Sequence, residues 1–336
     1  MDNPALTLGL AMGLGMLSQV IARKIYLPGI VVLLAGGVIF GPDGLNWIRP
    51  ASMGSALQII VGFAVAVILF EGGMNLRISR IKREQAAIRG LITIGALITL
   101  IGGTLSTLLF LGWDFRTAIL FGTLIIVTGP TVISPLLKRV RIHHGVSTVL
   151  EAEGILLDAI GAIVAVVALE IAISPSGLSL VKGLFHIISR LAVGAVLGIV
   201  GGGLLTLLFR IRKLIPEGLE NVFILSWVFA LFQLANAASP ESGIAAVTVA
   251  GMTIGNSNTY IQRELLEFKE QLTVLMIGML FILLAADVRI ADIQMLGLKG
   301  ILTVLFLMVV IRPLSVFSAT IHSDLDTRHK LLLSWI

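Results

Sequence analysis

Long apolar runs separated by short polar stretches occupy the chain from end to end. Because the hydrocarbon core of a bilayer is about 30 Å thick, a helix needs roughly 20 apolar residues to cross it. The pattern predicts eleven spanning helices, at residues 5–22, 28–42, 55–75, 86–111, 117–137, 147–173, 190–209, 219–237, 242–255, 270–287 and 296–320. The stretch 179–190 has polar residues on one side only, and we expect it to lie along the membrane interface before the seventh span. We therefore expect an all-α polytopic membrane protein.

Composition and charge agree with this interpretation. Hydrophobic residues make up 57% of the chain and charged residues only 13%. The mean hydropathy of +1.04 leaves too little polar surface to cover a globular core in water. Of the 24 Lys and Arg, seventeen follow odd-numbered spans and five follow even-numbered ones. By the positive-inside rule, the N-terminus lies outside a cell (inner) membrane and odd spans end in the cytoplasm. This distribution explains the net charge of +5 without a nucleic-acid partner.

Several kinds of chemistry are excluded by the residues present. The chain has no cysteine, which rules out disulfides, thiolate nucleophiles and cysteine metal sites. It also lacks HExxH, GxSxG and P-loop motifs and a paired-aspartate setting for intramembrane hydrolysis. We therefore expect neither an enzyme nor a bound cofactor.

Two consecutive spans carry the residues that are hardest to place in lipid. Asp158 lies about 16 Å along its helix from Ser147, near the middle of the bilayer. An acid at that depth is a functional hypothesis by default, and a structural ion pair or a hydrogen-bonded neutral acid is the alternative. The preceding span contains Gly129 and Pro130, which interrupt a helix, beside Thr128. Such breaks hold ions in transporters, although an ordinary proline kink is the alternative.

Glu153 and Arg312 form a second candidate group. Glu153 lies about 9 Å from the cytoplasmic end of its span, and Arg312 about 12 Å from that end of the eleventh span. Because each charge is costly alone in lipid, two opposite charges at similar depth should find each other. We predict a Glu153–Arg312 pair with a structural role.

With these residues identified, the chain resembles the cation:proton antiporter superfamily, in particular the NhaP-type sodium/proton exchangers. The resemblance rests on "LPGIVVLLAGGVIFGP", "ILFEGGMNLRISRIKR", "TGPTVISPLLKRVRI", "EAEGILLDAIG" and "ESGIAAVTVAGMTIGN", together with Arg312. It implies an NhaA/NhaP-like inverted-repeat antiporter fold with broken, crossing helices, usually as a homodimer. Residues 1–336 would be the membrane transport domain, with "LLLSWI" starting a twelfth helix. The last helices and any C-terminal regulatory domain would be absent.

The resemblance also implies site residues. Asp158 takes the position of the transporting aspartate, Thr128 that of an oxygen ligand of the monovalent cation, and Glu153 and Arg312 those of the structural ion pair. The chain departs from the family's TDP motif at Gly129 and from its ESLLND motif at Gly154 and Leu157. Thr131, Ser134, carbonyls around Pro130 or water would replace the missing oxygens.

The resulting expectation is exchange of a monovalent cation for H⁺ by alternating access across the lipid bilayer. Sodium is the expected cation, and potassium/proton exchange is the alternative. With Leu157 rather than a second carboxylate beside Asp158, we expect electroneutral exchange. A gated cation channel is a distant alternative, because the spans have few polar residues to line a continuous path.

Overall fold

A computed structural model describes residues 3–129, 144–173, 180–211, 215–216, 218–257, 264–323 and 325–335. Every regular element in these ranges is helical. The first half contains α1 (Pro4–Lys24), α2 (Gly29–Phe40), the 3₁₀ turn η1 (Pro50–Met53), α3 (Ser55–Asn75), α4 (Ile78–Arg83), α5 (Gln85–Gly90), the π-helical η2 (Leu91–Gly95), α6 (Ala96–Ser106), the π-helical η3 (Thr107–Leu111), α7 (Phe115–Leu124) and α9 (His144–Ile173). The second half contains α10 (Leu180–Arg210), α11 (Glu220–Ala238), α12 (Ser242–Gly255), α13 (Glu264–Ala286), α14 (Ile290–Phe306), the π-helical η5 (Leu307–Ile311), α15 (Arg312–Ala319) and α16 (Thr327–Trp335).

The helices agree with the predicted spans over the described ranges. Seven helical stretches there are long and apolar enough to cross a membrane. Four shorter apolar helices accompany them, at Gly29–Phe40, Phe115–Leu124, Ser242–Gly255 and Gln271–Ala286. Each of these eleven overlaps one predicted span, and the span predicted at 117–137 is helical in the described residues only up to Leu124. The last span begins after a sharp bend at Gly297, whose φ of +48° favours glycine.

The stretch predicted to lie along the interface before the seventh span is, from Leu180 on, part of the same helix as that span. Residues from Leu180 to Arg210 form one continuous helix, α10. No proline interrupts this stretch, and its glycines alone do not end a helix whose backbone bonds are made internally. With 31 residues, α10 is about 46 Å long, so it extends several turns beyond a hydrocarbon core of about 30 Å.

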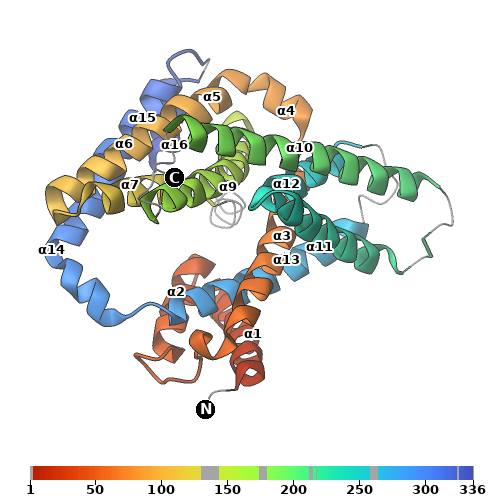
Figure 1. Cartoon of the computed structure of the whole chain (residues 1–336), viewed down its shortest axis with the longest axis horizontal. Coiled ribbons are helices and arrows are strands. Elements are labelled where there is room, and N and C mark those ends of the chain that lie inside the picture. Colours follow the sequence, from red (N-terminus) through yellow and green to blue (C-terminus); the bar gives the residue numbers. More distant parts are fainter. Residues whose placement is uncertain are drawn as a thin grey trace. The chain divides into compact units, whose positions relative to one another are not determined.

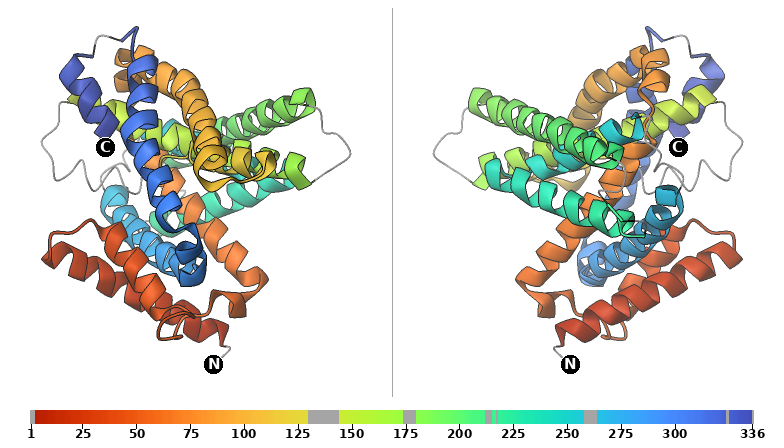
Figure 2. Two further views of the ribbon diagram at one scale, coloured as in Figure 1. Left: turned by 90° about the vertical axis from the view of Figure 1, so that its left-hand side faces the viewer. Right: turned by 90° about the vertical axis from the view of Figure 1, so that its right-hand side faces the viewer.

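The chain divides into two compact units that alternate along the sequence (Figures 1 and 2). The first comprises residues 1–71, 208–229 and 259–295, and the second comprises 72–207, 230–258 and 296–336. In the first unit α13 packs against α1 and α2. Glycines permit this approach, since a Cβ on Gly15 would lie 2.6 Å from the carbonyl carbon of Gly278.

The second unit is built around α9. The end of α9 near His144 packs against α4, α5, η2 and α16, and α7 packs on both α6 and α9. The core here contains fully buried side chains from η2, α9, α15 and α16. They are Leu91, Val146, Val149, Leu150, Val316 and Leu333. This packing surrounds α9 with apolar side chains on the turns that precede Glu153.

Helix α10 lies against α12 in the second unit through three glycines spaced four residues apart (Figure 1). A Cβ on Gly198 would lie 2.5 Å from the carbonyl oxygen of Ala246, closer than real contacts allow. Gly198→Ala is therefore expected to lower the stability by about 1–3 kcal/mol, because the two backbones must separate. Thermal unfolding of the purified protein in detergent measures this loss.

Gly203→Ala provides the matched control, because nothing lies within 4 Å of a Cβ at that position of the same helix. The control removes the general effect of replacing a helical glycine by alanine. Equal unfolding temperatures for the two variants would contradict the close packing of α10 on α12.

Candidate functional site

Helix α9 carries Glu153 and Asp158 on different sides. The two residues are five positions apart, which is about 140° around the helix axis and about 7.5 Å along it. Leu157 follows Glu153 by four positions and therefore shares its face. The side of α9 that carries Glu153 therefore also carries the apolar side chain of Leu157, and Asp158 points to a different side.

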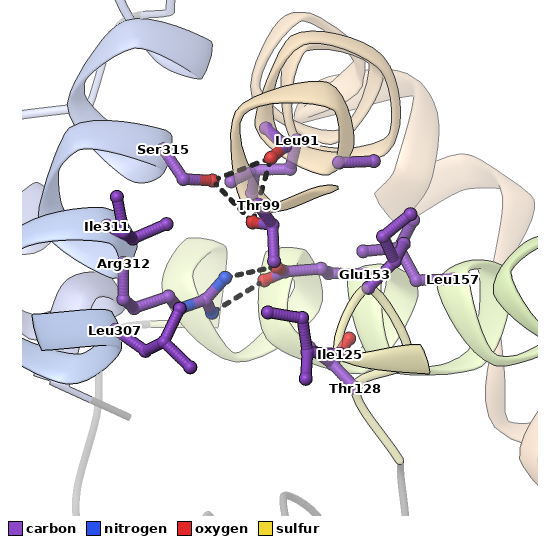
Figure 3. Close-up of a pocket in the computed structure, with 13 residues that line it drawn as sticks. Leu91, Thr99, Ile125, Thr128, Glu153, Leu157, Leu307, Ile311, Arg312 and Ser315 are labelled. Atoms are coloured by element: carbon purple, nitrogen blue, oxygen red, sulfur yellow. Dashed lines mark hydrogen bonds and ion pairs between the residues drawn. The ribbon is translucent and has the colours of Figure 1, made fainter. Parts of the chain in front are cut away.

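Glu153 and Arg312 form a two-pronged ion pair between α9 and α15. Arg312 Nη1 lies 2.6 Å from Glu153 Oε1, and Nη2 lies 3.2 Å from Oε2 (Figure 3). The Glu153 side chain is 1% exposed and that of Arg312 22% exposed. Arg312 is the first residue of α15, and Pro313 lies in the first turn of that helix. The structure thus brings together the two charges that the sequence places at similar depth.

A cavity of about 150 Å³ lies beside this ion pair (Figure 3). Two π-helical segments form part of its wall, η2 through Leu91 and Gly95 and η5 through Leu307 and Ile311. Such wide turns occur frequently at functional sites. The remaining lining residues are Ala96, Thr99, Ile125, Ile126, Thr128, Glu153, Leu157, Arg312 and Ser315. The volume is sufficient for several water molecules.

Hydroxyl groups supply most of the other polar atoms of this cavity. Ser315 Oγ donates to the Gly95 carbonyl oxygen at 3.0 Å, and Thr99 Oγ1 donates to the same oxygen at 2.9 Å. Thr128 Oγ1 is different, since it is buried and has no hydrogen-bond partner among the described residues. Buried polar atoms in native proteins are nearly always paired, so an unpaired one needs an explanation. An oxygen in this state is suited to bind a cation or a water molecule.

The break that we predicted at Gly129 and Pro130 begins earlier, at the end of α7. Asp114 caps α7 at its N-terminus, and hydrogen bonds from the Thr117 hydroxyl and backbone amide lower the pKa of this carboxyl group. The helix ends at Leu124, and Thr128 and Gly129 are not helical. Pro130 has no N–H to donate to the carbonyl of residue 126, and in a helix its ring would collide with that carbonyl. A regular helix must therefore end before Pro130. Pro130, Thr131 and Ser134 lie outside the described residues.

Asp158 is half-buried in the middle of α9. No residue of the described ranges donates a hydrogen bond to its carboxylate or pairs with it, and it is not among the residues that line the cavity. The stretch after α7 nevertheless passes close by. A Cβ on Gly161, one turn beyond Asp158, would lie 2.7 Å from Val127 Cγ2. Gly161 therefore brings the segment containing Thr128 against the turn of α9 that follows Asp158.

Sequence reasoning missed three features of this region. Gly161 could have been found as a glycine three residues after an intramembrane acid. The Thr99 and Ser315 hydroxyls had no signal, because threonine and serine are common in membrane helices. A second ion pair, between Glu170 and Arg190, was also missed, since both residues lie near predicted span ends, where charges are ordinary.

Comparison with known proteins finds similar sequences among antiporters. The K(+)/H(+) antiporter NhaP2 of Shewanella oneidensis is 27% identical over 320 residues, which cover 94% of this chain and 55% of that protein. The Na(+)/H(+) antiporter 1 of Methanocaldococcus jannaschii is 28% identical over 347 residues, covering 96% of this chain and 78% of that protein. The chain thus spans about half the length of NhaP2 and its similar relatives.

A solved structure and a family description complete the comparison. The structure of the sodium proton antiporter MjNhaP1 from M. jannaschii at pH 8 matches with a TM-score of 0.84 and 26% identity, covering 97% of this chain and 80% of that one. This match confirms the all-α, multi-span antiporter fold. The family described as "Sodium/hydrogen exchanger, transmembrane" matches residues 9–336. The chain therefore belongs to the transmembrane sodium/hydrogen exchanger family and is a multi-pass membrane protein.

Proposed function

We propose that this protein is a secondary active antiporter that exchanges a monovalent cation for H⁺ by alternating access, with Asp158 as the shared binding site. The observation that carries the proposal is the carboxylate of Asp158, half-buried at mid-helix and without a partner in the described residues. A carboxylate in that position is costly in lipid unless it is used. The Na(+)/H(+) and K(+)/H(+) antiporters among the relatives support the same reaction.

Asp158 provides one negative charge that either a proton or a cation neutralises, but not both at once. The Thr128 hydroxyl and backbone carbonyls after α7 would add oxygen ligands, since monovalent cations in transporters are held at such interrupted helices. Thr131 and Ser134 are further proposed ligands, and Gly129 and Pro130 keep the segment non-helical. Competition for one site couples the two fluxes, because each occupant must leave before the other binds.

The Glu153–Arg312 pair is proposed to be structural. Its two charges neutralise each other at hydrogen-bonding distance, so Glu153 offers little to a passing cation. With Leu157 between the two acids instead of a second carboxylate, one proton exchanges for one cation, and exchange is electroneutral.

Sodium is the proposed cation, in line with the Na(+)/H(+) antiporter of M. jannaschii. Potassium is the second candidate, for which the similarity to NhaP2 speaks. Gly129, Gly154 and Leu157 lack side-chain oxygens, which a small, strongly hydrated ion needs more than a large one does. Flux measurements with sodium and with potassium decide between the two ions.

The arrangement in the membrane follows from the charges. We propose that residues 1–336 form a membrane transport domain of the inner membrane, with the N-terminus outside and odd-numbered spans ending in the cytoplasm. A homodimer is the proposed assembly. Cysteines introduced singly at exposed connection residues, and labelled from one side of intact cells, determine the orientation because the chain has no cysteine of its own.

The experiment that tests the proposed function uses everted vesicles containing the complete gene product, energised to an acid interior. Addition of sodium, potassium or lithium is expected to dissipate the pH gradient with a rate that saturates and does not follow the membrane voltage. The cation with the highest rate at low concentration is the substrate. A voltage-dependent, non-saturating response would favour the channel, and no response to any cation would exclude antiport of these ions.

Thr128→Val tests the role of the unpaired hydroxyl. Because no described residue forms a hydrogen bond with Thr128 Oγ1, valine is expected to leave the stability unchanged or to raise it by up to about 1 kcal/mol. The KM for the cation is expected to rise several-fold, since one oxygen ligand is removed. Thermal unfolding and vesicle flux measure the two effects.

Thr123→Val is the matched control, from the last turn of α7 five residues earlier. Its hydroxyl donates to the Leu120 carbonyl oxygen at 2.7 Å, so valine there is expected to lower the unfolding temperature without changing the KM. A Thr128→Val protein with normal KM would remove Thr128 from the proposed site.

A further inference from the structure

The connection between α3 and α5 carries a basic surface. Residues 77–89 contain five basic residues and one acidic residue, Glu84. All five basic side chains are exposed, and we call them the α4 basic cluster: Arg77, Arg80, Lys82, Arg83 and Arg89. A cluster of this size next to a membrane helix attracts anionic lipid headgroups.

The neighbours of α4 place it at a membrane surface. One candidate span ends at Asn75 and the next begins at Gln85. Residues 76–84 alone connect the two, so α4 lies at or next to the headgroup layer of the bilayer. In the proposed orientation this is the cytoplasmic face.

The start of α4 is fixed to the end of α12. Arg77 Nη1 donates to the Gly255 carbonyl oxygen at 2.6 Å. The Asn256 side chain donates to the Leu76 carbonyl oxygen at 2.8 Å and accepts from the Ile78 backbone amide at 2.8 Å. On its other contacts α4 packs against α9 and α5 (Figure 1). Its backbone is therefore held in place before any ligand binds, which lowers the entropic cost of binding.

The five basic residues of the cluster are not equivalent. Arg77 is engaged by the hydrogen bond to α12, and Arg80 is near enough to Glu151 of α9 for the two charges to attract each other. The other three side chains form no hydrogen bond or ion pair with any residue that the structure describes, and they are Lys82, Arg83 and Arg89. Three cationic groups thus remain available to an anion.

An exposed apolar side chain accompanies these charges. Ile78 is 42% exposed, and it precedes Lys82 by four positions, so the two share one side of α4. In a helix that lies in the membrane interface, the apolar side chain contacts acyl chains and the cationic one reaches the headgroups. A soluble anion would give Ile78 no apolar contact. The combination therefore favours a lipid over a free phosphate.

We propose that α4 and α5 bind an anionic phospholipid, with Lys82, Arg83 and Arg89 supplying the charge for its phosphate and Ile78 the contact with its acyl chains. The positive-inside rule accounts for the charge of this connection, but not for its fixed backbone or its exposed isoleucine. The site does not depend on the identity of the transported ion.

The first test measures lipid-dependent stability of the complete gene product in detergent. Phosphatidylglycerol is expected to raise the unfolding temperature more than phosphatidylcholine at the same concentration, because it binds the folded protein. Each basic residue near an anionic headgroup contributes about fivefold in affinity. Lys82→Gln with Arg83→Gln should therefore need roughly 25-fold more phosphatidylglycerol for the same increase. Lys82→Arg with Arg83→Lys keeps both charges and is expected to keep the increase.

Arg23→Gln with Lys24→Gln is the matched control, because it removes the same charge from the last turn of α1, where both residues are exposed. This control is expected to keep the effect of phosphatidylglycerol. Equal losses in the two double variants would show a general charge effect and overturn the site. Equal stabilisation by inorganic phosphate would overturn a lipid as the occupant.

The second test locates the lipid in a bilayer. Ser79→Cys introduces the only cysteine of the chain, at an exposed position of α4, and it is labelled with a bimane fluorophore. Brominated phosphatidylglycerol is expected to quench this label several-fold more steeply than brominated phosphatidylcholine at low mole fraction. Adding Lys82→Gln and Arg83→Gln should remove the difference.

Leu109→Cys is the control position, because it is 72% exposed near the other end of the same span. The two brominated lipids are expected to quench a label there equally. Equal quenching at position 79 in the otherwise unmodified protein would overturn the proposal. This comparison needs no charge variant, so it decides the question even if Lys82→Gln with Arg83→Gln fails to fold.

Discussion

Replacing Asp158 by asparagine is expected to abolish cation-dependent proton exchange while the protein remains folded. The amide has nearly the same shape but carries neither a proton that it can release nor a charge that can attract a cation. Because no residue in the described ranges bonds to the Asp158 carboxylate, the substitution breaks no contact there. The pH gradient of everted vesicles should then survive addition of every cation that dissipates it in the unmodified protein.

Ligand-induced stabilisation provides a second measurement for the same variant. A cation that binds only the folded protein raises its stability in proportion to the logarithm of its concentration over Kd. This increase in unfolding temperature is expected to vanish in Asp158→Asn. Glu151→Gln is the control, because this acid lies two turns earlier in α9 and accepts a hydrogen bond from the Ser147 hydroxyl of the same helix. A pH response that persists in Asp158→Asn would place the shared site elsewhere.

Replacing Arg312 by alanine is expected to have the largest effect on stability. It leaves the Glu153 carboxylate, which is 1% exposed, without its counter-charge. Removing one partner of a buried ion pair typically costs about 3–5 kcal/mol, because an uncompensated charge stays buried. We expect a large fall in the unfolding temperature and in the yield of monodisperse protein, measured by thermal scanning and size-exclusion chromatography.

Two companion variants test the reason for this loss. Arg312→Lys keeps the charge but loses the two-pronged geometry, so an intermediate stability is expected. Glu153→Gln combined with Arg312→Gln removes both charges and should be more stable than Arg312→Ala, since no unpaired charge remains. Wild-type stability of Arg312→Ala would show that the pair contributes nothing to the fold.

The separation of the two acids on α9 gives these predictions different readouts. Asp158 and Glu153 point to sides of the helix that are about 140° apart, and Leu157 shares the side of Glu153. A change at Asp158 therefore leaves the ion pair in place, and a change at Arg312 acts first on folding. The Asp158 variant is therefore expected to lose transport and keep its stability, whereas the Arg312 variant is expected to lose stability.

Much of this protein was accessible from its sequence because lipid imposes local rules. Apolar run length alone predicted the helices at residues 5–22, 55–75 and 219–237, since a helix in lipid must satisfy its own backbone and reach across a fixed thickness. The same reasoning singled out Asp158, whose cost depends on its depth and not on its neighbours. We predicted the Glu153–Arg312 contact because each charge is costly alone in lipid and the two lie at similar depth. The structure places these groups 2.6 Å apart.

Other features depended on which helix faces meet. The cavity between η2 and η5 arises where segments distant in the sequence pack together. The same is true of the buried Thr128 hydroxyl, which has no hydrogen-bond partner among the described residues. The continuity of α10 and the Glu170–Arg190 pair belong to the same class, because a charge near a span end looks the same whether it faces water or a partner helix. Depth in the membrane depends on position along one helix, so the sequence by itself can predict it. Rotation about each helix axis, which decides the partner of a side chain, is set by packing against neighbours, so only the tertiary structure decided it.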